Sequence, residues 1–308
     1  MKIFVTGGTG FIGSHTVRAL AGRGYELMLL IRDNARACST DRSISEVASV
    51  CGDLADINGW KYRFMEFRPD AVLHLAWEGL PDYGIDMCMR NLNYGLQLFR
   101  LAGEAGCKCV VATGSCWEYA HRTGGITENS PIESSAVFPA AKNSLRIMGE
   151  AMSRHYGMHF YWPRLFFVYG PGQRATSLIP SVIISVEAGR EPEVRNPESR
   201  NDFIYITDVA DAVVWLIEKM PEGIVYNVGS GNSTSVSDII SAVYETMGIK
   251  QHPNNTNKRP PEREADDFWA DIGVISNDTG WSPKYNIRAG IKATVDHYNR
   301  ESKTGKRI

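Results

Sequence analysis

Several features that would assign a protein to a special class are scarce in this sequence. Only six of its 308 residues are cysteine, which is too few for a disulfide scaffold, and Cys107 and Cys109 share an apolar strand, which favours buried thiols over a metal site. The net charge of −2 gives no general attraction to nucleic acid or to an anionic membrane. No apolar run has the length of a membrane span, and residues 1–20 follow the pattern of strand, glycine turn and helix instead of that of a signal peptide. We therefore expect a soluble cytoplasmic protein that binds neither nucleic acid nor membrane.

Short apolar runs alternate with stretches of helical length in the first half of the chain. The runs are Lys2–Thr6, Glu26–Ile31, Ala48–Cys51, Ala71–Leu75, Cys109–Thr113 and His159–Phe167. The helical stretches between them include Phe11–Gly22, Asp86–Ala105 and Phe138–Tyr156. This alternation is typical of βαβ units around a parallel sheet, so the sequence predicts an α/β fold with a Rossmann-type, doubly wound parallel sheet.

The alternation ends after the segment Tyr169-Gly-Pro-Gly. Short strands, prolines and polar loops follow it. We expect residues 1–166 to form a dinucleotide-binding domain, to which residues 203–229 return. Residues 167–202 and 230–308 are expected to form a smaller C-terminal α/β cap that binds the substrate.

Three glycines follow the first predicted strand. In Val5-Thr-Gly-Gly-Thr-Gly-Phe-Ile-Gly13 they are Gly7, Gly10 and Gly13. Glycine permits the tight turn and lets backbone N–H groups approach a pyrophosphate at the N-terminus of a helix. A glycine trio alone is a weak signal, but its position between a strand and a helix at the start of an α/β chain predicts a dinucleotide site.

The whole glycine string resembles that of the extended short-chain dehydrogenase/reductase family, which contains nucleotide-sugar epimerases, dehydratases and reductases. Later segments match landmarks of this family in the same order: Gly52-Asp53-Leu54, Pro69–Ala76, Asn91, Arg164–Gly172, Asp202–Asp208, Tyr226–Gly229 and Gly280–Pro283. Besides the second-strand arginines discussed next, the resemblance implies cofactor contacts at Gly7, Gly10, Phe11, Ile12, Gly13, Asp53, Leu54, Leu75, Ala76, Trp77, Asn91, Thr113, Lys142 and Leu165.

The end of the second strand bears on which dinucleotide is bound. Where NAD-using relatives carry an acid for the ribose 2′-hydroxyl, this sequence has Ile31, followed by Arg32. A guanidinium there can pair with the 2′-phosphate of NADP, and Arg36 could assist. In the alternative interpretation, Asp33 is the ribose acid and Arg32 is a solvated surface charge. We expect NADP, with NAD as the second choice.

Hydride chemistry on a sugar also needs a group that exchanges a proton with the sugar oxygen. The resemblance assigns this task to a Ser or Thr after the fifth strand and to a Tyr-x-x-x-Lys motif on the next helix, whose lysine lowers the pKa of the phenol and binds the nicotinamide ribose. Ser115 and Lys142 stand at the serine and lysine positions. Position 138 holds Phe instead of the tyrosine, so the proton donor of the motif is missing.

Three interpretations of Phe138 stay open. It is a substitution made to trap a complex, a natural residue in an enzyme that uses another acid, or the mark of an inactive site. The presence of both Ser115 and Lys142 favours the first. Tyr119 is the nearest candidate for another acid, although a packing role is favoured for it.

The two residues after Ser115 bear on the reaction. Dehydratases of the family carry an Asp-Glu pair there, and its decarboxylases carry a Glu two residues after the hydroxyl, whereas this sequence has Cys116 and Trp117. Elimination and decarboxylation are therefore not expected. Arg32 favours a reductase that consumes NADPH over an epimerase that recycles NAD. We expect reduction of the 4-keto group of a CDP- or dTDP-linked 6-deoxyhexose in deoxysugar biosynthesis, with a nucleotide-sugar 4-epimerase and a non-catalytic NADP-binding sensor as alternatives.

The nucleotide-sugar substrate is expected to lie between the two units of the chain. The candidates on the sugar side of the nicotinamide are Trp77, Ser115, Cys116 and Phe167. The candidates for the nucleotide diphosphate, which calls for fixed guanidinium donors, are Arg174, Arg259 and Arg263. The resemblance also implies a homodimer through the helices Asp86–Ala105 and Phe138–Tyr156.

Overall fold

The fold is that of a computed structural model, which describes residues 1–32, 47–121, 123–194, 196–249 and 267–303. Its centre is a sheet with the strand order β12-β8-β5-β4-β1-β2-β3, in which β6 also pairs with β8, and these pairings are parallel. The strands are β1 (Lys2–Thr6), β2 (Glu26–Ile31), β3 (Ala48–Cys51), β4 (Ala71–His74), β5 (Cys109–Ala112), β6 (Gly114–Ser115), β8 (His159–Leu165) and β12 (Val225–Val228). The predicted Rossmann-type α/β fold is confirmed.

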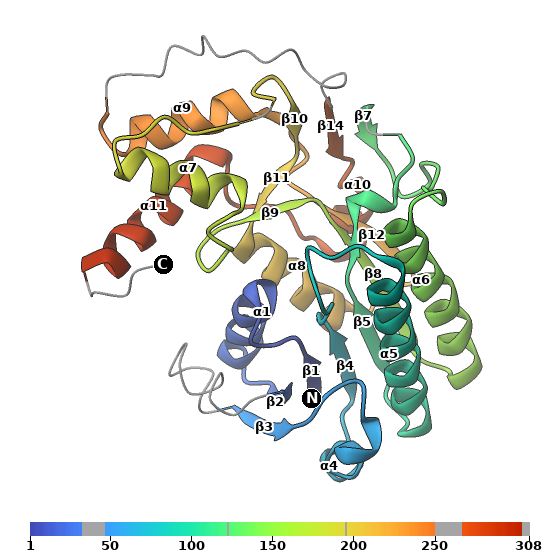
Figure 1. Cartoon of the computed structure of the whole chain (residues 1–308). Coiled ribbons are helices and arrows are strands. Elements are labelled where there is room, and N and C mark those ends of the chain that lie inside the picture. The colour runs from blue at the N-terminus through green and yellow to red at the C-terminus, as the bar shows by residue number, and fades with distance from the viewer. Residues whose placement is uncertain (33–46, 122, 195, 250–266, 304–308) are drawn as a thin grey trace.

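Helices cover both faces of this sheet (Figure 1). One face carries α1 (Phe11–Gly22) and α8 (Ile206–Lys219), and the other carries α4 (Lys61–Phe67), α5 (Ile85–Glu104) and α6 (Val137–Tyr156). Because successive side chains of a strand point to opposite faces, Ile3 and Val5 pack in the first core and Phe4 packs in the second. Burial on both faces explains why these strands are apolar throughout.

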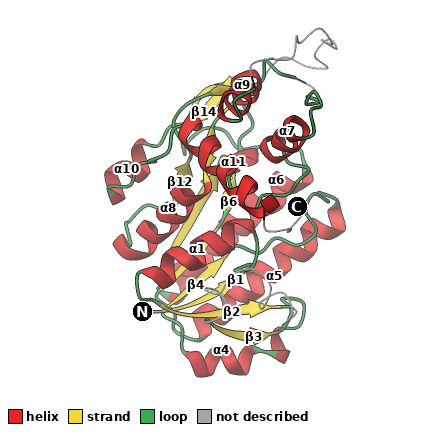
Figure 2. Ribbon diagram, turned by 90° about the vertical axis from the view of Figure 1, so that its left-hand side faces the viewer, coloured by secondary structure: helices red, strands yellow, loops and turns green. Residues whose placement is uncertain are grey.

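The remaining elements form the upper part of the molecule in Figure 1, seen from the side in Figure 2. A third core lies between a two-stranded parallel sheet and three helices: β9 (Phe167–Tyr169), β11 (Phe203–Tyr205), α7 (Leu178–Glu187), α9 (Val236–Thr246) and α11 (Ile287–Lys303). A four-stranded sheet of order β13-β10-β14-β7 lies nearby, made of Thr234–Ser235, Arg200–Asn201, Asp267–Ala270 and Thr123–Ile126, and α10 spans Gly273–Thr279. The boundaries predicted for a binding domain and a cap stay a prediction.

In the described part of the chain, no helix is both long and apolar enough to cross a bilayer.

The run predicted as one strand from His159 to Phe167 is divided in the structure. The strand β8 ends at Leu165, and the next residue, Phe166, donates its N–H to the carbonyl of Val228 at 3.0 Å. Phe167 then donates to the carbonyl of Asp202, also at 3.0 Å, and starts β9 beside β11. The chain therefore passes from the large sheet to the two-stranded sheet within two residues. An uninterrupted apolar run in the sequence cannot reveal this change.

Cys107 also differs from the prediction. It precedes β5, because its N–H bonds to the carbonyl of Ala102 in the turn that follows α5, so only Cys109 lies on the strand. Both thiols are buried, and burial raises the pKa of each to about 12. Thiols with so high a pKa stay protonated and unreactive, so Cys107 and Cys109 have packing roles.

A single buried carboxylate joins three distant segments of the chain. Asp202, between β10 and β11, is 0% exposed. It accepts hydrogen bonds from the N–H groups of Ser230, Gly231 and Ala270 at 2.6, 2.9 and 3.0 Å, and from the hydroxyl of Ser230 at 2.7 Å. Ser230 and Gly231 follow a strand of the large sheet, whereas Ala270 ends β14, so this carboxylate links the two parts of the molecule.

Candidate active site

The glycine turn has the geometry that a bound pyrophosphate requires. Gly7 has a φ of +74°, and a Cβ on it would lie 2.6 Å from the backbone N of Ala76, while a Cβ on Gly13 would lie 2.0 Å from the carbonyl oxygen of Gly7. The turn closes through a 3.0 Å bond from the N–H of Gly10 to Gly7, and no described side chain caps the start of α1. The first N–H groups of that helix have no intrahelical acceptor, so the turn fits the phosphates of a dinucleotide.

The segment after β4 forms the neighbouring wall of this turn. Leu75 and Ala76 contact Gly7, and Trp77 follows them. Asn91 on α5 fixes the loop, because its Oδ1 accepts the N–H of Glu78 at 2.7 Å and its amide donates to the carbonyls of Glu78 and Met87 at 3.0 and 2.8 Å. Asn91 was predicted as a cofactor contact. Its side-chain bonds give it the role of positioning the loop that carries Trp77.

The residues predicted around the adenosine lie at the ends of β2 and β3. Arg32 is exposed and pairs with Glu78 across 3.2 Å, with side chains that are 57% and 33% exposed. Asp53 accepts the N–H of Ala55 at 2.8 Å, and its carbonyl accepts the indole N–H of Trp60 at 2.8 Å. Asp33 and Arg36 lie outside the described residues, as do Arg259 and Arg263. The ion pair of Arg32 was not anticipated, because Glu78 is 46 residues away in the sequence.

Lys142 is buried beside the wall formed by Trp77. Its ammonium donates to the carbonyl oxygen of Thr113 at 2.9 Å and lies over the rings of Trp77 and Trp162, 4.0 and 5.7 Å from their centroids. Burial lowers the pKa of Lys142 to about 8, although the nearby Glu118 carboxylate raises it. An ammonium has three donors, so those not used by Thr113 can serve a ribose hydroxyl.

Phe138 lies one turn before Lys142 on α6, where side chains four residues apart share a helix face. Its ring makes edge contacts with Trp77, at a centroid distance of 5.4 Å, and with Tyr83, at 5.0 Å. The structure therefore brings together Lys142, Trp77 and Phe138. It adds Tyr83, which sequence analysis missed.

Ser115 ends β6 and caps the short helix Cys116–Glu118. Its Oγ accepts the N–H of Trp117 at 3.2 Å, and its own N–H donates to the Glu118 carboxylate at 2.8 Å. The bond accepted from Trp117 leaves the hydroxyl proton of Ser115 able to donate. The capping box fixes the backbone of Ser115 relative to β8.

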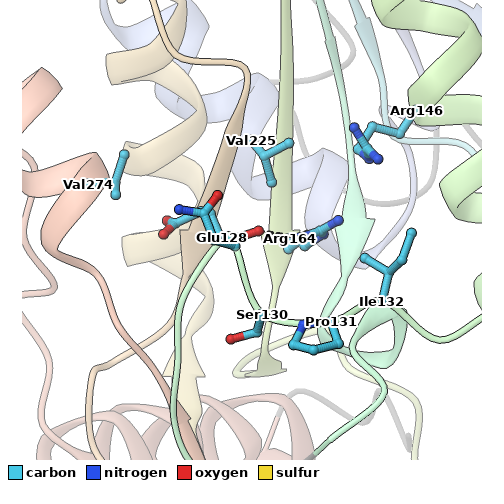
Figure 3. Close-up of a pocket in the computed structure, with 9 residues that line it drawn as sticks. Glu128, Ser130, Pro131, Ile132, Arg146, Arg164, Val225 and Val274 are labelled. Atoms are coloured by element: carbon cyan, nitrogen blue, oxygen red, sulfur yellow. Dashed lines mark hydrogen bonds between the residues drawn. The ribbon is translucent and has the colours of Figure 1, made fainter.

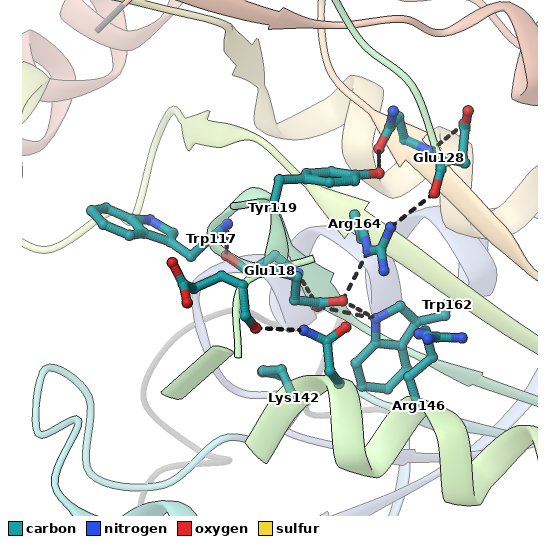
Figure 4. A network of polar contacts seen from close by, with 12 residues as sticks. Trp117, Glu118, Tyr119, Glu128, Lys142, Arg146, Trp162 and Arg164 are labelled. Carbon is teal, nitrogen blue, oxygen red and sulfur yellow. Dashed lines mark hydrogen bonds and ion pairs between the residues drawn. The ribbon is translucent and has the colours of Figure 1, made fainter. Parts of the chain in front are cut away.

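Glu118 is the centre of a polar network that sequence analysis did not identify. It is 0% exposed and accepts hydrogen bonds from the indole N–H of Trp162 at 3.0 Å and from Nε of Arg164 at 2.8 Å. Figure 4 shows the Trp162 indole and the Arg164 guanidinium both bonded to the Glu118 carboxylate. A buried carboxylate is stable only with such partners. The available signal for this network in the sequence is that Glu118 and Arg164 each fall within an apolar segment.

Tyr119 is held in the same network and does not resemble a free acid. Its hydroxyl donates to Oδ1 of Asn227 at 2.6 Å, and its ring lies 4.5 Å from the guanidinium carbon of Arg164. The side chain is 1% exposed, and burial raises the pKa of Tyr119 to about 12. These contacts give Tyr119 a packing role.

Comparison with known proteins identifies the family. The model described as "NAD dependent epimerase/dehydratase family" matches residues 3–229. The chain belongs to this family. The dTDP-D-glucose 4,6-dehydratase of Mus musculus is 24% identical over 330 residues, which cover 97% of this chain and 89% of that protein.

Solved structures of the epimerase/dehydratase family share the fold. The UDP-glucose 4-epimerase of Thermotoga maritima, crystallised with UDP-glucose, has a TM-score of 0.85 at 23% identity, covering 98% of this chain and 100% of that one. The UDP-glucose 4-epimerase of Thermus thermophilus, in complex with NAD, has a TM-score of 0.80 at 25% identity, covering 97% and 99%. The predicted resemblance to nucleotide-sugar enzymes of the extended short-chain dehydrogenase/reductase type is confirmed.

The residues predicted on the sugar side are unequally accessible in this family member. Cys116 is buried, whereas Phe167 is half-buried and its ring contacts those of Phe203 and Phe268. Arg174 is exposed before α7. Phe11 and Ile12 open α1, and Leu165 ends β8 next to Ser115.

A cavity of about 580 Å³ lies beside Arg164 and Arg146 (Figure 3). Its lining residues are Glu128, Asn129, Ser130, Pro131, Ile132, Arg146, Arg164, Val225 and Val274. None of the nine is a predicted site residue. Arg164 belongs both to this lining and to the Glu118 network.

Proposed function

We propose that this member of the epimerase/dehydratase family reduces the 4-keto group of a CDP- or dTDP-linked 6-deoxyhexose with NADPH. The observation that carries the proposal is the buried ammonium of Lys142, which lies between Trp77 and Trp162 and one helical turn from position 138. A bound dinucleotide supplies the hydride. Lys142 would hold the nicotinamide ribose, and Ser115 would donate a hydrogen bond to the sugar oxygen.

Reduction suits the segment after Ser115 better than elimination does. Elimination of water requires a side chain that can take up and release a proton beside the sugar. Cys116 is buried, and Trp117 has no acidic group. The carboxylate of Glu118 is fully engaged with Ser115, Trp162 and Arg164. We therefore do not propose for this chain the dehydration reaction of the dehydratase named among its relatives.

The preference for NADP rests on Arg32. Its ion pair with Glu78 is partly exposed, and such pairs contribute about 1 kcal/mol or less. A 2′-phosphate offers a doubly charged, bidentate partner that can replace Glu78. In this proposal the arginine exchanges one partner for the other when the cofactor binds.

A second candidate is 4-epimerisation of a nucleotide sugar with retained NAD. The pairing of Arg32 with Glu78 favours it, because a neutralised arginine discriminates less between the two dinucleotides. The UDP-glucose 4-epimerase of Thermus thermophilus is a complex with NAD. Both candidates use Ser115 and Lys142 in the same roles.

Turnover with defined sugars separates the candidates. The protein is mixed with dTDP-4-keto-6-deoxyglucose or its CDP analogue and NADPH or NADH, and cofactor absorbance is followed. One NADPH consumed for each sugar reduced supports the reductase. Interconversion of UDP-glucose and UDP-galactose with no net cofactor consumption supports the epimerase instead. Binding of the dinucleotide without binding of any nucleotide sugar would leave the sensor alternative.

Lys142→Met is the matched variant for this assay, with Lys292→Met as its control. Lys142 is buried in the site, whereas Lys292 is exposed on α11 and pairs with Asp296. Loss of turnover with the first variant and not with the second supports the proposed role of the buried ammonium. Equal turnover of the two variants would contradict it.

A further inference from the structure

The missing hydroxyl at position 138 has a phenol beside it. The ring centroids of Phe138 and Tyr83 are 5.0 Å apart, with an angle of 67° between the ring planes. Tyr83 comes from the loop between β4 and α5, far from α6 in the sequence. The two rings are in edge contact, so the phenol of Tyr83 lies directly beside position 138.

The position of Tyr83 is fixed by its backbone, while its ring stays accessible. The thiol of Cys88 donates to the carbonyl of Tyr83 at 3.6 Å, and α5 starts two residues after Tyr83. The side chain is 52% exposed. A proton lost from this phenol can therefore be replaced directly from water.

Trp77 is a second aromatic neighbour of Phe138. One indole contacts both the Phe138 ring, edge-on, and the Lys142 ammonium, over its face. Its Nε1 is buried and has no hydrogen-bond partner among the described residues. A buried indole N–H without an acceptor points to a ligand oxygen at this position, because leaving such a donor unpaired is costly.

Two other acids of the described site are engaged in the buried network. Tyr119 is bonded to Asn227, and Glu118 is bonded to Arg164. The side chains of Tyr119 and Glu118 are also buried, at 1% and 0% exposure. Among the described phenols, Tyr83 is the one that contacts position 138.

We propose that Tyr83 is the proton donor of this enzyme, in place of the tyrosine that the motif lacks at position 138. The inference rests on the proposed reduction of a keto sugar. As hydride from the bound dinucleotide forms the new C–H bond at C4, the O–H bond of Tyr83 breaks and a new O–H bond forms at the sugar oxygen. The phenolate then takes a proton from water, so one NADPH and one proton are consumed for each alcohol formed.

The test uses four versions of the full chain: the given sequence, Tyr83→Phe, Phe138→Tyr, and the double variant Tyr83→Phe/Phe138→Tyr. Tyr62→Phe is the matched control, because Tyr62 is an exposed tyrosine on α4. Each protein is assayed for NADPH oxidation with dTDP-4-keto-6-deoxyglucose, and its affinity for both compounds is measured by calorimetry.

We expect the given sequence to be active and Tyr83→Phe to lose roughly 10²–10⁴-fold in kcat with little change in either affinity, since a general acid contributes about that much. Phe138→Tyr should then restore activity in the Tyr83→Phe background. A merely structural role of Tyr83 would not be rescued by a hydroxyl on another helix.

Two results would overturn the proposal while leaving the function intact: a Tyr83→Phe variant within about threefold of the parent, or an inactive parent that Phe138→Tyr makes active. If Phe138→Tyr binds the keto sugar and NADPH but does not reduce it, the reductase function itself is wrong. The Phe138→Tyr protein thus reports on the function, and the Tyr83→Phe protein reports on the donor.

Discussion

Replacing Glu118 by glutamine would remove a buried negative charge while keeping the shape of the side chain. The carboxylate is 0% exposed, and the guanidinium that it pairs with, on Arg164, is 2% exposed. The substitution therefore leaves a positive charge in the interior with no counter-charge at 2.8 Å. Breaking a buried pair from one side typically costs about 3–5 kcal/mol, so we expect the free energy of unfolding to fall by that amount.

Urea unfolding of three variants measures the effect. Glu66→Gln is the control, because Glu66 pairs with Arg63 at 3.1 Å on the surface, where removing a partner costs about 1 kcal/mol or less. The double variant Glu118→Gln/Arg164→Met should regain much of the loss, since it removes the uncompensated charge. If Glu118→Gln lowers the free energy of unfolding by no more than Glu66→Gln does, Glu118 and Arg164 do not form the buried ion pair that we describe.

Three further predictions concern the cofactor, the pH dependence and the assembly. Arg32→Ala should weaken NADPH binding by about ten-fold or more with little effect on NADH, and Glu78→Gln should strengthen NADPH binding; equal losses for both cofactors in calorimetry would refute the 2′-phosphate role. Because the pKa of Lys142 is lowered to about 8, its charge is present below that pH and lost above it, so dinucleotide affinity should fall as pH rises through about 8; a flat affinity between about pH 7 and 9 would contradict this. Met89 is 63% exposed on α5, so Met89→Glu should turn the expected homodimer into a monomer in sedimentation, and a parent that is already monomeric would disprove the dimer.

The central sheet and the glycine turn could be predicted from sequence because each depends on local pattern. The strand β1 alternates between two cores, and its apolar residues are contiguous. Gly7 and Gly13 are required by close backbone contacts that only glycine permits. Lys142 was singled out by its position in a motif, and the structure adds its bond to the carbonyl of Thr113.

Contacts between distant segments could not be predicted in this way. From the sequence, Arg32 was expected to bind a phosphate. In the structure it pairs with Glu78, which lies in the loop after β4. Tyr83 was overlooked because a loop residue has no periodic pattern, although the fold brings it against Phe138. Glu118 was not singled out, because its partners Trp162 and Arg164 lie on β8, more than 40 residues later in the chain.

The carboxylate of Asp202 has a consequence for how the molecule opens. The amide hydrogens of Ser230, Gly231 and Ala270 share this one acceptor, although they belong to segments up to 40 residues apart. Releasing any one segment leaves a buried carboxylate short of donors, which makes partial detachment costly. These three amides should therefore exchange their hydrogens with solvent at a common, slow rate, as members of one cooperative unit that spans both parts of the molecule.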